Sequence, residues 1–150
     1  MEFVQEHLTA IIKGIRRNAE DHQSGTPDTP GSANRKQAEI STADVSELYM
    51  LLGRDRTRMA LELVDRGVVC MHNGGRNVFR VRRHADELDL DSCYCLLPGW
   101  FCNACAADSS AGAALPCIHV VAVLLAVLQG KCTAEQVPAD DLAVVIFSHM

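Results

Sequence analysis

Six of the seven cysteines in this 150-residue chain lie after residue 92, and a histidine closes the series. The pattern is Cys-x-Cys at 93–95, Cys-x-x-Cys at 102–105 and Cys-x-His at 117–119. Structural zinc takes four sulfur or nitrogen ligands in a tetrahedron, and short cysteine pairs separated by a loop supply them. The eleven residues from 106 to 116 are rich in alanine, serine and glycine, so this loop is compliant. We therefore predict one Zn²⁺ bound by Cys102, Cys105, Cys117 and His119.

Two alternatives to this ligand set stay open. Cys93 or Cys95 can replace Cys102 or Cys105 as a ligand, or the thiols can be buried and inert, as cysteine often is. Inert thiols leave the clustering and the closing histidine unexplained. The odd cysteine count, and an acidic N-terminus where a secretory signal needs a basic patch, indicate a reducing compartment rather than a disulfide framework.

An apolar segment follows the last cluster. Residues 111–128 carry no formal charge, which approaches the length of a membrane span, but Pro116 leaves only about 13 residues for a helix. We therefore predict a buried helix over 117–129, ended by Gly130, and no membrane partner. Because this helix has no polar face, we also expect one side of it to dock a partner subunit, with close approach at Ala122 and Ala126.

The remaining sequence predicts an α+β fold. Apolar spacing and caps indicate helices over 3–17, from Ser41 or Thr42 to 52, and from Asp55 or Thr57 to 66, with another beginning at Asp140 or Asp141. β-rich runs at 68–71 and 77–81 predict a hairpin. We divide the chain into an N-terminal helix (1–20), a flexible Pro/Gly/Ser-rich linker (21–40) and a zinc-binding domain (41–150). The expected order is helices, β-hairpin, zinc knuckle and buried apolar helix.

Positive charge is concentrated in one window of an acidic protein. Residues 54–83 contain eight arginines and three acidic residues, which makes the window +5 and leaves −10 for the rest of a chain of net charge −5. Arg76, Arg80 and Arg82 alternate along the second hairpin strand and so share one face. Such a basic face is typical of a surface that binds nucleic acid or an acidic protein. A solvated face without a partner is the alternative.

The order of these parts resembles the SWIM zinc-finger family, in which Cys-x-Cys, a variable loop and Cys-x-His lead into an apolar helix. Over about residues 48–130 the chain is similar to the small SWIM-domain subunits of Shu complexes. The matching segments are Leu51-Leu52-Gly53, the run 60–66, the hairpin 75–81 and the run 117–123. Two departures stand out: the first pair here is Cys-x-x-Cys, and Ile118 occupies a position where lysine is common.

The resemblance implies a non-catalytic subunit in homologous-recombination DNA repair. Such a subunit forms a heterodimer with a RecA-like recombinase paralogue and promotes recombinase filaments on single-stranded DNA, contacted directly or through the partner, in the nucleus. The chain has no Walker A loop, so any ATPase belongs to a partner. It also lacks the His-x-Glu and Pro-Cys-x-x-Cys of zinc deaminases, so we expect no enzyme. A stand-alone nucleic-acid-binding zinc finger, with Trp100 as its one evident stacking aromatic, is the alternative.

Overall fold

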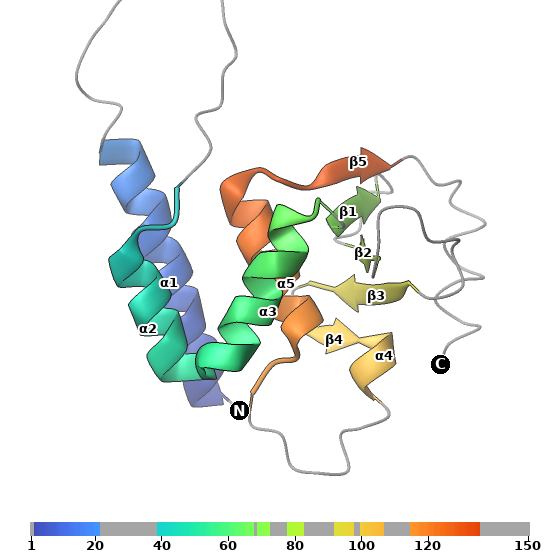
Figure 1. Cartoon of the computed structure of the whole chain (residues 1–150), viewed down its shortest axis with the longest axis horizontal. Coiled ribbons are helices and arrows are strands. Elements are labelled where there is room, and N and C mark those ends of the chain that lie inside the picture. The colour runs from blue at the N-terminus through green and yellow to red at the C-terminus, as the bar shows by residue number, and fades with distance from the viewer. Residues whose placement is uncertain are drawn as a thin grey trace, which may run out of the picture.

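The α+β architecture predicted from the sequence is present in the computed structural model (Figure 1). The structure describes residues 2–21, 39–67, 69–72, 78–82, 92–97, 100–106 and 115–135. Helices α1 and α2 lie side by side, α3 and α5 pack against each other in the middle, and a five-stranded sheet lies on the other side (Figure 1). The C-terminal helix expected from Asp140 or Asp141 lies outside the described residues.

Helix α1 (Glu2–Asp21) is part of the main core. Its helically spaced residues Leu8 and Ile15 are each 1% exposed, and Ile15 packs with Leu128 of α5. The helix contacts both α2 and α5. The predicted linker 21–40 lies mostly outside the described residues, although Ile40 at its end packs against the core.

Helices α2 (Thr42–Leu52) and α3 (Arg54–Asp65) follow each other with only Gly53 between them. Ser41 caps α2 as predicted: its hydroxyl accepts from the backbone N–H of Asp44, and the Asp44 carboxylate accepts from the N–H of Ser41. Gly53 has φ +88°, a conformation that glycine adopts without strain. The buried hydroxyl of Thr57 bonds to the carbonyl of Leu48 at 3.2 Å, which fixes α3 against α2.

The sheet has strand order β4-β3-β2-β1-β5. Strands β1 (Val69–His72) and β2 (Val78–Val81) pair antiparallel, which confirms the predicted strands, while the turn between them lies outside the described residues. Strand β3 (Cys93–Leu96) pairs with β2, and β4 (Phe101–Cys102) pairs with β3, both antiparallel. Strand β5 (Thr133–Glu135) pairs with β1 in parallel, which makes the sheet mixed. Strands β3, β4 and β5 are not among the strands predicted from the sequence.

Helix α5 (Ile118–Gln129) lies at the centre of the molecule. It begins after Cys117 and ends at Gly130 in the left-handed conformation, as predicted. Helices α1 and α3 and strands β1 to β4 all contact it. Ala122 and Ala126 are 0% exposed under these elements, so the expectation that they dock a partner is wrong. None of the helices in the described ranges is long and apolar enough to cross a membrane.

The packing of α2 predicts that two substitutions in this helix differ strongly in their effect on stability. Leu48 is fully buried, whereas Met50 two residues later is 89% exposed. We expect Leu48→Ala to lower the free energy of unfolding by about 2–5 kcal/mol, because the deletion leaves a cavity. Met50→Ala should change it by less than about 0.5 kcal/mol. Urea unfolding of both variants measures the difference, and equal losses would contradict this packing.

Candidate metal centre

The buried face of the sheet carries three cysteines. Side chains alternate between the two faces along β3, so Cys93 and Cys95 lie on the same face. Their cross-strand partners on β2 are Val81 and Phe79. Cys102 on β4 is the direct partner of Cys95 across the strand pair. All three thiols lie in the hydrophobic core that also contains α5.

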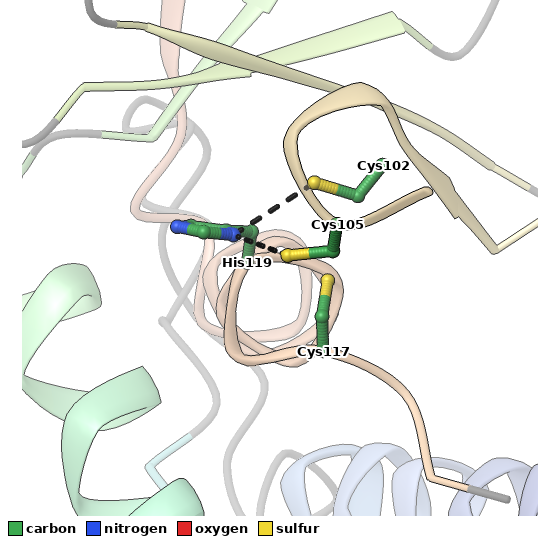
Figure 2. A group of neighbouring side chains, drawn as sticks. All are labelled: Cys102, Cys105, Cys117 and His119. Atoms are coloured by element: carbon green, nitrogen blue, oxygen red, sulfur yellow. Dashed lines mark hydrogen bonds between the residues drawn. The ribbon is translucent and has the colours of Figure 1, made fainter. Parts of the chain in front are cut away.

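The other donors come from two helices next to this face. The short helix α4 (Asn103–Ala106) begins directly after β4 and carries Cys105. The start of α5 supplies Cys117, its N-cap residue, and His119 in its first turn. Figure 2 shows the side chains of Cys102, Cys105, Cys117 and His119 pointing toward one another. The structure therefore brings together the four ligands predicted from their spacing.

The distances within this group suit a tetrahedral metal site. Nδ1 of His119 lies 3.7 Å from Sγ of Cys102 and 3.5 Å from Sγ of Cys105 (Figure 2). All four donor atoms lie within 4.8 Å of one another. With metal–sulfur bonds of about 2.3 Å and metal–nitrogen bonds of about 2.0–2.1 Å, a tetrahedron separates its nitrogen and sulfur ligands by about 3.6 Å. The four side chains can therefore hold one metal ion with small side-chain shifts.

Two hydrogen bonds outside the group hold its supporting backbone. The Arg56 guanidinium on α3 donates to the carbonyl of Pro116 at 2.5 Å and so ties the residue before Cys117 to α3. The side-chain oxygen of Asn103 accepts from the backbone N–H of Tyr94 at 2.7 Å, which fixes the start of α4 against β3. Both bonds position residues next to ligands, so the site is ordered by the fold around it.

The charge balance favours anionic sulfur at the centre of the group. Hydrogen bonds with Cys102 and Cys117 raise the pKa of His119 to about 10. A hydrogen bond from Cys117 is the main cause that lowers the pKa of Cys102 to about 5, and the same contact raises the pKa of Cys117 to about 12. Burial raises the pKa of Cys105 to about 11. Among the three thiols of this group, Cys102 therefore ionises first, and the thiolate is the form that binds metal. A hydrogen bond with Cys102 also lowers the pKa of the neighbouring Cys93 thiol to about 4.

The alternative ligand pair, Cys93 and Cys95, lies next to the group of four donors. Cys93, Cys95 and Cys102 form a second set of donors within 4.8 Å of one another, and all three are buried. The Cys93 thiol also donates to the carbonyl of Val81 at 3.6 Å. The two pairs, which the sequence offers as alternatives, both meet at Cys102 in the structure. The signal was the Cys-x-Cys spacing, which on a strand turns both thiols to one face.

The structure does not present the predicted arginine face to solvent as a whole. Arg80 on β2 is only 5% exposed and lies between Cys70 of β1 and Tyr94 of β3 in the sheet register. Arg82, just after β2, is half-buried, and Arg76 lies outside the described residues. A guanidinium covered in this way is not placed to contact a phosphate backbone. The exposed arginines of the basic window that the structure describes include Arg54, Arg58 and Arg66, all on or beside α3.

Comparison of the chain with protein-family models, with curated proteins and with solved structures finds no match.

Substitution of single cysteines should distinguish the metal ligands from the cysteines that do not bind metal. We expect Cys117→Ala to lose most of its bound metal and to unfold at lower temperature, because it removes one of four donors. Cys132→Ala is the matched control, since Cys132 is half-buried and lies outside both donor groups. Metal analysis of the two purified variants measures this, and equal metal content would show that Cys117 is not a ligand.

Burial of Arg80 predicts a stability effect rather than a binding effect. We expect Arg80→Ala to lower the free energy of unfolding by about 1–3 kcal/mol, as is usual when a buried polar side chain is removed. Arg58→Ala, whose side chain is 56% exposed and pairs with Glu62, should lose at most about 0.5 kcal/mol. If Arg80→Ala kept full stability but weakened single-stranded DNA binding with a flatter salt dependence, its side chain would face solvent after all.

Proposed function

We propose that this chain is a non-catalytic zinc-binding subunit of a Shu-type complex, which supports homologous-recombination DNA repair in the nucleus. In this role it promotes recombinase filaments together with a RecA-like paralogue, its partner in a heterodimer. The observation that carries the proposal is the convergence of Cys102, Cys105, Cys117 and His119 at the start of the buried helix α5. This is the arrangement that the resemblance to SWIM zinc fingers implies.

The donor set favours zinc as the metal. Three cysteine sulfurs and one histidine nitrogen at tetrahedral spacing are typical ligands of structural Zn²⁺. When bound, zinc supplies a cross-link between the β4–α4 segment and the first turn of α5. Four protein donors leave no position for a reacting water molecule, which supports a structural role rather than a catalytic one.

The magnitude of such a cross-link matters for a chain of this size. Structural zinc sites contribute on the order of 10 kcal/mol or more, whereas whole domains are stable by about 5–15 kcal/mol. The β4–α4 segment is short, with two strand residues and four helical residues. Short elements of this kind depend on tertiary links, so we infer that zinc keeps this edge of the sheet folded and available to a partner.

Exposed apolar side chains suggest where the partner binds. Phe3 on α1 is 66% exposed and Met50 on α2 is 89% exposed. Figure 1 shows the first turn of α1 and the last turn of α2 at the same end of this helix pair, and Phe3 and Met50 belong to these two turns. Aromatic residues and methionine are enriched in protein interfaces. We place the contact with the RecA-like partner at this end rather than on α5.

A stand-alone nucleic-acid-binding zinc finger is the second candidate. The observation in its favour is that Arg54 and Arg58 lie exposed near the start of α3. Against it, Arg58 forms an ion pair with Glu62 at 2.8 Å, and Glu62 also lies 4.0 Å from Arg66. These contacts partly neutralise the basic surface that a phosphate backbone would need.

Purification of the tagged full chain from its own cells, followed by mass spectrometry, separates the two candidates. The Shu-type function predicts a RecA-like ATPase recovered in equal amount with the chain. Recovery of nucleic acid without such a protein would favour the stand-alone zinc finger. Recovery of neither would contradict both functions and leave only the metal site.

The proposed contact surface predicts a specific loss of partner binding. We expect Phe3→Asp and Met50→Asp each to weaken the complex at least about tenfold, because each puts a charge into an apolar contact. Thr133→Asp is the control, since Thr133 is exposed and belongs to β5, a strand that lies apart from α1 and α2 in Figure 1. Zinc content should stay equal in all three variants. If Phe3→Asp and Met50→Asp both bound the partner with full affinity, the proposed contact surface would be wrong.

A further inference from the structure

The two donor groups of this chain share one residue and form a continuous cluster. Cys102 belongs both to the group with Cys105, Cys117 and His119 and to the group with Cys93 and Cys95. Nδ1 of His119 lies 3.7 Å from the sulfur of Cys102, and the sulfurs of Cys93 and Cys95 lie within 4.8 Å of it. Five potential metal ligands therefore surround the sulfur of Cys102, and the resulting set of six donors is two more than one zinc ion takes.

Burial of the second group makes its three thiols unusual. Cys93, Cys95 and Cys102 are 5%, 0% and 4% exposed. The sulfur atom of Cys95 lies within 4.8 Å of the sulfur atoms of the other two. Buried thiols that lie this close together have few possible partners other than one another or a metal ion. Thiolates bind zinc and similar soft cations in preference to hard ones.

We propose that the six side chains bind two zinc ions, with the thiolate of Cys102 as a bridge between them. The inference deepens the proposed function, because the first ion is the one held by Cys102, Cys105, Cys117 and His119. The second ion binds Cys93, Cys95 and the shared Cys102.

The net charge of the buried cluster supports a second ion. Three thiolates, one neutral imidazole and one Zn²⁺ carry a net charge of about −1. A second Zn²⁺ that displaces the protons of Cys93 and Cys95 adds two positive and two negative charges, so the total stays at about −1. An uncompensated charge in a protein interior is energetically costly. Binding of the second ion leaves the net charge unchanged, so it adds no such cost at the buried face of the sheet.

Zinc stoichiometry is the direct test, measured by mass spectrometry of metals in the purified full chain. We expect about two zinc ions per chain in the wild type and about one in the double variant Cys93→Ser/Cys95→Ser. The matched control is Cys70→Ser/Cys132→Ser, which changes two cysteines outside both donor groups and should keep both ions.

A second measurement tests the bridge and does not depend on any variant folding. In the wild-type chain loaded with ¹¹³Cd²⁺ in place of zinc, NMR should show two cadmium resonances that are coupled to each other through the shared sulfur. Two resonances without mutual coupling would contradict the bridge at Cys102. A single resonance would contradict the second ion.

The outcomes also separate this inference from the proposed function. One zinc per chain in both the wild type and the Cys93→Ser/Cys95→Ser variant would overturn the second ion and leave the proposed zinc site intact. One zinc in the wild type that is lost in this variant would overturn both, because Cys93 and Cys95 would then be ligands of the only ion. A wild-type chain without zinc would also overturn both.

Discussion

Helix α5 has no polar side, and the rest of the fold is arranged around this constraint. Its residues from Val120 to Val123 are 0% exposed, as are Leu125 and Ala126. A helix that is apolar all round must be covered on every side, and each fully buried valine or leucine side chain contributes about 1.5–3 kcal/mol. Helices α1 and α3 and the sheet supply the cover. These elements cover most of α5, while Val127 near its end is 39% exposed.

The same constraint positions the candidate metal centre. Because the core fixes α5, it also fixes Cys117 and His119 at the start of that helix. The sheet face that packs against α5 carries Cys102 and its partner Cys95. The donors are thus brought together by hydrophobic packing, and a bound metal ion would strengthen a contact that the fold already makes. In this account zinc links two parts of the core at its edge.

Sequence patterns predicted the features that depend on local signals. Apolar spacing and caps identified α1, α2, α3 and α5, and cysteine spacing identified the four grouped donors. Strands β4 and β5 have only two and three residues, and β5 forms because β1 offers a parallel edge, so no local signal marks them. Alternation placed Arg80 on a strand face but could not reveal that both faces of β2 are covered. The prediction that Ala122 docks a partner was wrong for the same reason. The elements that bury Ala122 are far from it in the sequence, so the local pattern did not show them.

The most direct test of the central claim uses Trp100, the single tryptophan of the chain, which packs against the core two residues before Cys102. Its fluorescence and the thermal unfolding of the chain are measured before and after a strong chelator removes all metal. If a structural metal ion holds this edge of the fold, the emission shifts to longer wavelength and Tm falls by about 20 °C or more, and both recover with added zinc. Complete metal removal with unchanged emission and unchanged Tm would contradict the account.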